Sequence, residues 1–245
     1  MKKYKMKYDI HTHTVFSHGK GTIEDNVKVA LEKGLERVGI SDHGSGHLLY
    51  GIKKSSLGIM REEIDRLRAI YPQIRIDLGI EANIMDLDGT LDIGVEELTY
   101  LDYVLAGYHY GVLGKNPLKA TGSHISNFLN LNFSKSANTD RIIAALYGNE
   151  ISILTHPGDK GPVDIFEIAK ACHDTDTLME ISTWHSHLTV EEIRICAKTE
   201  VKFVISSDAH SPERVGTFQG GLSRAIEAGL DMERIDNIEV CEFRD

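Results

Sequence analysis

Residues 9–19 read DIHTHTVFSHG and place three histidines, His11, His13 and His18, within eight positions. They follow directly on a short apolar-alternating run at residues 8–11, which predicts a β-strand. Side chains alternate along an extended chain, so His11 and His13 are expected to point to the same face. Taken alone, these histidines fit either a metal site or a histidine-rich surface loop. The rest of the chain has to decide between the two.

A short strand followed by a longer amphipathic segment recurs along the whole chain. Strands are expected at residues 8–11, 37–41, 75–81, 103–107, 151–155, 178–182 and 203–207. Helices are expected at residues 22–33, 56–70, 138–147, 164–171, 190–198 and 218–228. Thr22 or a neighbour is expected to start the first helix, and Gly34, Gly148 and Gly229 are placed to end three of them. This alternation favours parallel strands joined by right-handed crossovers.

The expected fold is a single α/β domain over residues 1–245, a closed or nearly closed barrel of TIM type. A doubly wound open sheet is the competing fold, but the GxGxxG stretch that usually follows its first strand is absent. No composition break, repeat or Pro/Gly-rich linker divides the chain. Residues 44–55 and 108–135 follow strands without fitting the pattern, so both are candidate active-site loops at the carboxyl face of the barrel.

Composition restricts the class of partner. The 245 residues are 41% hydrophobic and carry a formal net charge of -10, which argues against a long nucleic acid as partner. The three cysteines, Cys172, Cys196 and Cys241, form no CxxC pair, so neither a disulfide framework nor a thiolate zinc site is indicated. Because no apolar run suits a signal peptide or a membrane span, we expect a soluble cytoplasmic protein without a membrane partner.

Six of the seven expected strands deliver a His, Asp or Glu at their carboxyl ends, which converge on one pocket in a barrel. These residues are His11 and His13, Asp42 and His43, Glu81, His109, His156, and Asp208 and His210. Imidazole and carboxylate are good ligands for zinc, manganese and iron, and a carboxylate can bridge two ions. Without Asp42 and with His18 there are nine candidate ligands. One zinc ion takes about four, so two or three clustered ions are needed.

The other histidines are interpreted as hydrogen-bonded residues of loops or helix surfaces. They are His47, His124, His173, His185 and His187. His185 and His187 lie in the segment STWHSH, where contact with a phosphate is the alternative interpretation. Trp184 in the same segment is interpreted as structural, with stacking on a substrate as the alternative, and Lys160 is a candidate phosphate-binding cation.

The ordered motifs resemble those of the polymerase and histidinol phosphatase (PHP) superfamily. The matching stretches, from about Asp9 to His210, are DIHTHT, ISDHG, GIEANI, AGYH, LTHPG and SSDAH. The chain is most similar to the small stand-alone bacterial phosphatase branch, in which GIEANI and a following Asp-Gly, here Asp88 and Gly89, also occur. The resemblance implies a distorted (β/α)7 barrel.

The resemblance also implies a trinuclear metal centre of divalent ions, with zinc as the expected metal and manganese or iron as alternatives. The first ion would be held by His11, His13, Glu81 and Asp208. The second would be held by Glu81, His109 and His156, with Glu81 bridging the two. The third would be held by His18, His43 and His210.

The expected function is hydrolysis of a phosphate monoester by a metal-dependent phosphatase acting on a small phosphorylated substrate. A hydroxide shared by the two ions that Glu81 bridges would attack phosphorus, because a bound divalent ion lowers the pKa of water to about 7. Asp208 is assigned to the catalytic centre as a ligand. Asp42 is expected to orient His43 or to shuttle a proton. Three divalent ions bring about +6 of charge, which reconciles an acidic protein with an anionic substrate.

Other functions remain open at this point. A phosphodiesterase or nuclease acting on short nucleic acids or nucleotides differs only in leaving group and access. A metal-dependent amidohydrolase fits HxH and a late Asp, but its metal-bridging lysine has no counterpart in YVLAGYH. A non-catalytic metal-binding or regulatory module is a further alternative, although loss of catalysis usually starts with the ligands and all nine positions are filled. The sequence leaves the substrate and the oligomeric state open.

Overall fold

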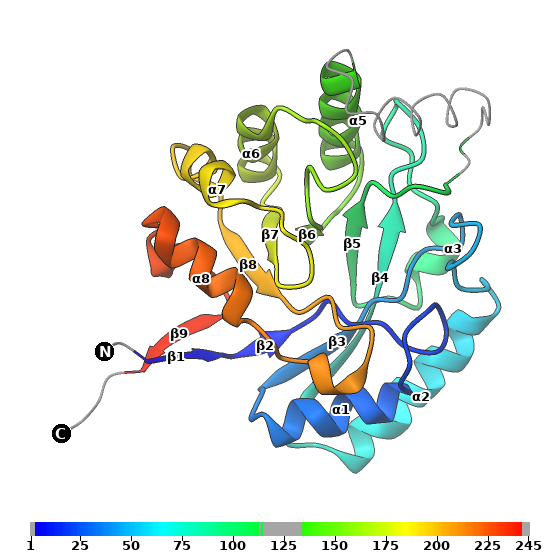
Figure 1. The fold of residues 1–245 in the computed structure, drawn as a ribbon. Coiled ribbons are helices and arrows are strands. Elements are labelled where there is room, and N and C mark those ends of the chain that lie inside the picture. Colours follow the sequence, from blue (N-terminus) through cyan, green and yellow to red (C-terminus); the bar gives the residue numbers. More distant parts are fainter. Residues whose placement is uncertain (1–2, 113, 115–133, 242–245) are drawn as a thin grey trace.

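A computed structural model describes residues 3–112, 114 and 134–241, and these form a nearly closed barrel of seven parallel strands (Figure 1). The strands are β2 (Tyr8–Asp9), β3 (Arg37–Ile40), β4 (Arg75–Asn83), β5 (Tyr103–Gly107), β6 (Ile153–Leu154), β7 (Leu178–Ser182) and β8 (Phe203–Ser206). They pair in sequence order, and every neighbouring pair is parallel. The predicted (β/α)7 barrel is therefore confirmed.

Helices surround the strands on the outside of the barrel (Figure 1). They are α1 (Ile23–Glu32), α2 (Ser56–Ile70), α3 (Val95–Leu98), α5 (Ser134–Gly148), α6 (Ile165–Asp174), α7 (Val190–Cys196) and α8 (Gln219–Ala228), with single 3-10 turns η1 (Pro212–Arg214) and η2 (Met232–Arg234). Their inward faces bury apolar side chains such as Val27, Met60 and Ile168 against the strands in one main cluster. None of the helices within the described residues is both long and apolar enough to cross a lipid bilayer.

The first and last strands meet beyond their carboxyl ends, and this contact closes most of the barrel. The N–H of His13 donates to the carbonyl of Ala209 at 2.8 Å. Within the strands themselves, the side chain of Asn237 bridges β2 and β8. It donates to the carbonyls of Tyr8 at 2.8 Å and Ile205 at 2.7 Å, and it accepts from the N–H of Ile205 at 3.1 Å. An open doubly wound sheet would leave these two edges apart.

Tyr103 fills the space between strands on opposite sides of the barrel. It belongs to a small buried cluster with Ile10, Ile153 and others, and its hydroxyl donates to the carbonyl of Ile10 at 2.8 Å. Gly39 and Gly79 give the ring its space, since an added Cβ would lie 2.2 Å from the hydroxyl oxygen at Gly39 and 2.3 Å from the ring at Gly79. These glycines are therefore required by a close approach and not by a turn.

The helix ends follow the expected local signals. Thr22 starts α1 with a capping box, because its hydroxyl accepts from the N–H of Asp25 at 3.1 Å and its N–H donates to the Asp25 carboxylate at 2.9 Å. Gly34 and Gly229 follow α1 and α8 with φ of 70° and 73°, in the left-handed region that glycine adopts at low cost. The predicted end of α5 at Gly148 is also confirmed.

Four parts of the structure differ from the sequence-based prediction. An antiparallel pair, β1 (Lys3–Met6) with β9 (Ile238–Cys241), was not predicted. Each strand is only four residues long, and its partner lies at the opposite end of the chain. Helix α3 was also missed, and α5 begins at Ser134, four residues earlier than position 138. Strand β6 spans only residues 153–154. His124 and most of the candidate loop 108–135 lie outside the described residues, and the single domain over residues 1–245 stays a prediction.

Candidate metal centre

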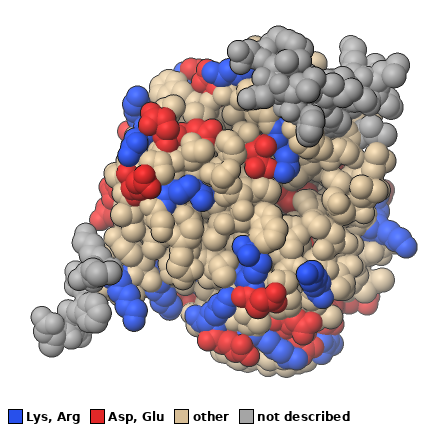
Figure 2. Space-filling model, in the orientation of Figure 1, with Lys and Arg blue, Asp and Glu red and all other residues tan. Residues whose placement is uncertain are grey.

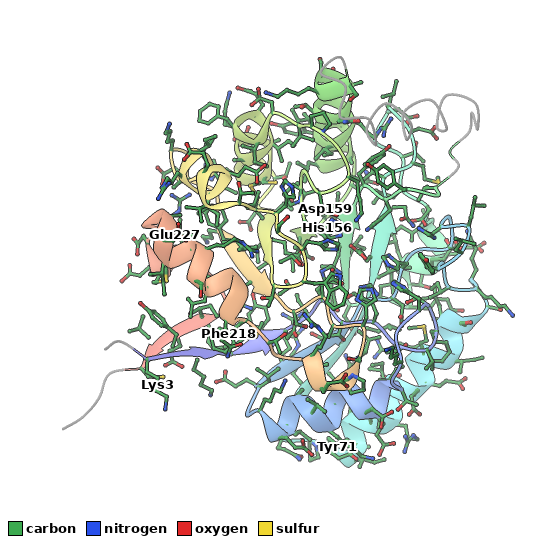
Figure 3. The ribbon with its side chains drawn as sticks, in the orientation of Figure 1. Lys3, Tyr71, His156, Asp159, Phe218 and Glu227 are labelled. Atoms are coloured by element: carbon green, nitrogen blue, oxygen red, sulfur yellow. The ribbon has the colours of Figure 1, made fainter. Side chains whose placement is uncertain are left out.

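A cleft of about 270 Å³ opens at the carboxyl ends of the strands. Seven of the nine predicted ligands line it: His18, His43, Glu81, His109, His156, Asp208 and His210. His11 and His13 are fully buried, at 0% exposure. Figure 3 places His156 in the middle of the barrel, at the end of β6. The chain therefore brings all nine residues to one end of the barrel, as predicted.

One carboxylate oxygen of Glu81 faces two histidines. Its Oε1 lies 3.2 Å from Nε2 of His109 and 3.0 Å from Nε2 of His156. The two histidine nitrogens are 3.3 Å apart. Ligands on one tetrahedral zinc ion are separated by about 3.3 Å, because the zinc–ligand bonds are about 2.0 Å long. The three atoms thus have the spacing of three ligands on a single ion.

The other oxygen of Glu81 faces a second set. Oε2 lies 3.4 Å from Nε2 of His11 and 3.7 Å from Nε2 of His13. Oδ1 of Asp208 completes the group, at 3.6 Å from the same nitrogen of His11 and 3.1 Å from that of His13. These separations are again close to those around one tetrahedral ion. Glu81 therefore presents one oxygen to each of two ligand sets, the arrangement that a bridging carboxylate requires.

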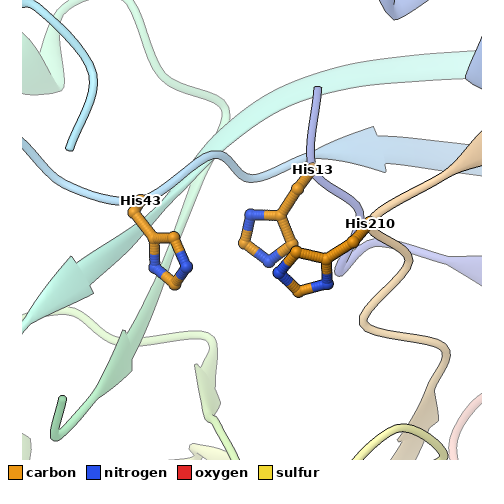
Figure 4. Close-up of side chains that lie close together, drawn as sticks. All are labelled: His13, His43 and His210. Carbon is orange, nitrogen blue, oxygen red and sulfur yellow. The ribbon is translucent and has the colours of Figure 1, made fainter. Parts of the chain in front are cut away.

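A third group of imidazoles adjoins the second set (Figure 4). Ligand atoms of His13, His43 and His210 lie within 4.8 Å of one another. His18 approaches the same group through its ring, with ring centroids 4.2 Å from His210 and 4.9 Å from His43. The three predicted ligands of the third ion are neighbours, and His13 lies among them as well.

The buried charge of the site calls for a cation. Glu81, Glu180 and Asp208 are at most 2% exposed, and their ion pairs within the described part of the chain are all with histidines. A buried carboxylate is costly unless it is paired or coordinates a metal. Among the described residues, Nε2 of His11 and Oε2 of Glu81 are buried without a hydrogen-bond partner. A donor set of imidazole and carboxylate with unsatisfied atoms fits divalent transition metals.

The electrostatics favour the metal-binding forms of His18, His109 and Glu81. Burial lowers the pKa of His109 to about 3 and that of His18 to about 4, which keeps both imidazoles neutral at physiological pH. Burial alone would raise the pKa of Glu81, but the histidines around it, His109 first, hold this pKa well below its usual range. A neutral imidazole and an ionised carboxylate are the forms that bind a metal ion.

Two of the predicted ligands adopt a backbone conformation that is uncommon for side chains with a Cβ. His156 has φ of 29° and Asp208 has φ of 50°, each two residues after the end of its strand, β6 or β8. Such conformations cost of order 1–3 kcal/mol and cluster at functional sites. The N–H of His156 is held by the carboxylate of Glu180 at 2.7 Å, which stabilises the turn. The backbone is therefore strained at two residues whose side chains line the cleft.

Two buried residues that are hydrogen-bonded to predicted ligands were missed by the sequence analysis. Glu180 on β7 lies with Oε1 at 2.5 Å from Nδ1 of His11. Asn83 at the end of β4 has its side-chain oxygen 2.8 Å from Nδ1 of His109, and its amide donates to Asp92 at 2.6 Å. Carboxylates and amides in these positions fix the ring of a metal ligand and its tautomer. An acid within the otherwise apolar strand LMEIS was the available signal for Glu180.

Asp42 has a different role from the expected one. In the described part of the chain, its carboxylate is hydrogen-bonded to the loop after β2 and not to His43. It accepts from the N–H and the hydroxyl of Thr14, at 2.7 and 2.6 Å, and from the hydroxyl of Ser17 at 2.5 Å. This loop carries His13 and His18. Asp42 therefore holds the loop that carries two predicted ligands, and the prediction that it orients His43 is corrected. Its proton-shuttle alternative stays a prediction.

The remaining histidines divide between the cleft and the surface. His47 and His185 are loop residues with polar partners, as interpreted, but both also line the cleft. The side-chain Nδ1 of His187 instead lies 3.0 Å from Oε2 of Glu192, near the start of α7. His173 is exposed in the last turn of α6. Loop residues of this kind cannot be assigned from spacing alone, because a loop has no fixed periodicity.

Trp184 and Lys160 also lie at the cleft. Trp184 is 48% exposed, and the guanidinium carbon of Arg214 lies 4.2 Å from its ring centroid. The ammonium of Lys160 lies 2.5 Å from Asp159. Their predicted contacts with a substrate stay predictions.

Comparison with known proteins identifies the family of this chain. Residues 9–200 match the PHP domain family. A probable phosphatase of Acetivibrio thermocellus is 28% identical, with 98% of this chain and 94% of the relative covered. A probable phosphatase of Thermoanaerobacter sp. (strain X514) is 30% identical over the same shares of the two chains.

The fold is also that of solved proteins. A histidinol phosphate phosphatase from Lactococcus lactis, crystallised with zinc, L-histidinol and phosphate, superposes with a TM-score of 0.65 at 15% identity, covering 92% of this chain and 95% of that one. A putative histidinol phosphatase from Listeria monocytogenes gives the same TM-score, with 86% and 97% covered. At this identity the likeness concerns the fold. With the family match across residues 9–200 and the ligand geometry above, the chain belongs to the PHP domain family.

Proposed function

We propose that this protein is a phosphatase that hydrolyses phosphate monoesters with a trinuclear centre of divalent metal ions. The observation that carries the proposal is Glu81, whose Oε1 lies 3.0 Å from His156 and whose Oε2 lies 3.4 Å from His11. Oε2 also lies 2.9 Å from Nδ1 of His43, a ligand of the proposed third ion. Phosphate esters are the substrates that the PHP family match and the curated relatives, described as probable phosphatases, support. Zinc is our first choice of metal, since a histidine-rich donor set suits it and the Lactococcus lactis protein was crystallised with zinc.

Each proposed ion has its own set of ligands in this chain. His11, His13 and Asp208 would hold the first ion, and His109 and His156 the second, with Glu81 between them. His18, His43 and His210 would hold the third. Ions in these positions would supply a hydroxide nucleophile near neutral pH, because a bound divalent ion lowers the pKa of water to about 7. Glu180 and Asn83 keep the rings of His11 and His109 in position.

The form of the cleft supports a small substrate. A cleft of about 270 Å³ accommodates a compact phosphorylated molecule and is at the lower limit of common ligand pockets. On the face shown in Figure 2, Lys and Arg lie interspersed with Asp and Glu over α1 and α2. The described part of this face shows no wide basic surface, and the formal net charge is -10. We therefore propose a small phosphorylated substrate and not a long nucleic acid.

Two measurements test the proposal. Elemental analysis of the purified protein should give close to three transition-metal ions per chain. Turnover of p-nitrophenyl phosphate should exceed that of bis-p-nitrophenyl phosphate and of a dipeptide panel. Faster turnover of the diester would assign a phosphodiesterase, and metal content of one ion or none would contradict the trinuclear centre.

A substitution at Glu81 tests the bridging role directly. Glu81→Ala should abolish turnover and release two ions together, because it removes an oxygen from each ligand set. Asp77→Asn is a matched control. Asp77 is a buried carboxylate on the same strand, but it pairs with Arg37 at 2.6 Å instead of facing the cleft. The control should keep its ions. Activity retained in Glu81→Ala would refute the bridging role.

A further inference from the structure

The loop that follows β7 contributes a histidine to the ligand centre. Nε2 of His185 lies 3.2 Å from Oδ2 of Asp208, and its ring centroid is 4.7 Å from that of His156. One ligand atom from each of these three residues lies within 4.8 Å of the other two. The other oxygen of Asp208, Oδ1, faces His13 at 3.1 Å. Asp208 therefore presents its second oxygen to a group that the three predicted ion sites do not include.

Asp159 holds the far side of the His185 ring. Nδ1 of His185 lies 3.2 Å from Oδ2 of Asp159, and the ammonium of Lys160 lies 2.5 Å from the same oxygen. The N–H of Asp159 donates to the carbonyl of His156 at 3.1 Å, so one tight turn carries both residues, which Figure 3 labels together. Histidines that bind metals usually donate their second ring N–H to a carboxylate, which leaves the first nitrogen for the ion.

We infer that His185 is a protein ligand of the ion that His156 binds, and that Asp159 is the residue that positions it. The inference rests on the proposed metal centre and adds a fourth protein ligand to Glu81, His109 and His156. Four-coordinate zinc can expand to five ligands during a reaction, so this addition leaves room for a water or a substrate oxygen. The ion bound there should then be held more tightly than three protein ligands alone would hold it.

The same loop supplies a control. His187 is two residues away and also pairs with a carboxylate, but its Nδ1 lies 3.0 Å from Glu192 near the start of α7. It does not line the cleft as His185 does. His187→Ala therefore disturbs the loop without removing a proposed ligand.

The test measures zinc binding and not activity. The wild-type protein and the variants His185→Ala, Asp159→Asn and His187→Ala are loaded with zinc. Bound zinc is then measured by elemental mass spectrometry across a series of chelator concentrations. In His185→Ala one of the ions should bind at least about tenfold more weakly than in the wild type. Asp159→Asn should weaken the same ion by about 10–100-fold, the usual effect of removing an orienting partner. His187→Ala should behave as the wild type does.

Cobalt substitution gives a second readout, since the visible absorption of bound cobalt depends on its ligands and should change in His185→Ala. Thermal unfolding of the metal-free proteins identifies a variant that fails to fold. In that case His185→Gln replaces it, because the amide can still donate to Asp159 but is a poor zinc ligand. Wild-type zinc affinity in a folded His185 variant would overturn the inference. This holds even if the variant hydrolyses esters with poor leaving groups more slowly than the wild type does. Absence of zinc from the wild-type protein would instead refute the proposed function.

Discussion

Glu180 holds His11 in position, with Oε1 of the carboxylate 2.5 Å from Nδ1 of the ring. The second oxygen of Glu180 accepts the N–H of His156 at 2.7 Å. One fully buried acid on β7 therefore positions a proposed ligand from each of the two sets that share Glu81. Because Nδ1 of His11 is directed at Glu180, Nε2 is the nitrogen that remains for a metal ion.

Glu180→Gln should weaken metal binding at the set that contains His11. An amide can donate to or accept from the ring but no longer favours one tautomer of His11, so we expect a 10–100-fold loss of zinc affinity. Competition with a chromogenic chelator measures this loss. Glu62→Gln, at an exposed position of α2, is the control and should leave zinc affinity unchanged. Equal zinc affinity in Glu180→Gln and the wild type would show that Glu180 does not orient a ligand.

The carboxyl ends of the barrel strands could be predicted, because these strands are short and apolar and are followed by polar residues. In the stretch FVISSDAH the change from apolar to polar marks the end of β8 and the start of the site, and Asp208 and His210 lie where this pattern placed them. Barrel geometry then brings such ends together, whatever the sequence distance between them. Prediction of the common site therefore needed the fold class and not the individual contacts.

Glu180, Asn83 and His185 could not be assigned in this way. Each acts through a contact with a residue far away in sequence, such as the 169 positions between Glu180 and His11. An acid in a buried strand shows that some partner exists, but hydrophobic periodicity does not identify it. The antiparallel pair of β1 and β9 was missed for another reason, because each strand has only four residues and its partner lies at the opposite end of the chain.

Asp42→Ala should destabilise the protein through the loop that carries His13 and His18. The carboxylate accepts three hydrogen bonds from Thr14 and Ser17, and the three donors would be left in a buried site. Hydrogen bonds to charged groups contribute about 1.5–3 kcal/mol each and are not additive, so we expect a loss of about 2–4 kcal/mol in the free energy of unfolding. Urea titration of the metal-free protein measures it.

Asp65→Ala serves as the comparison for Asp42→Ala. Asp65 is 59% exposed on α2 and pairs with Arg61 and Arg68, so its loss should cost no more than about 1 kcal/mol. Similar costs for the two substitutions would mean that the hydrogen bonds of Asp42 do not stabilise the fold.

Alanine substitutions at two glycines should have opposite effects on stability. At Gly79 a Cβ would lie 2.3 Å from the ring of Tyr103, so overpacking should cost about 1–3 kcal/mol. At Gly58, inside α2, the nearest atom to a Cβ is a ring carbon of Tyr100 at 3.8 Å. There alanine should stabilise the helix by about 0.5–1 kcal/mol, because glycine is a poor helix former. Thermal and urea unfolding of both variants test the signs, and a neutral Gly79→Ala would show that the barrel interior is loosely packed.

Removal of metal should lower stability, because it leaves the carboxylates of Glu81, Glu180 and Asp208 buried beside one another with only histidines as partners. A ligand that binds only the folded state adds about 2.7 kcal/mol when its free concentration is 100 times the dissociation constant. We therefore expect a chelator to lower the unfolding temperature of the wild type, and added zinc to restore it. In Glu81→Gln the shift should be smaller, since fewer ions remain to be removed. A chelator that leaves the unfolding temperature of the wild type unchanged would show that these carboxylates do not bind metal in the folded protein.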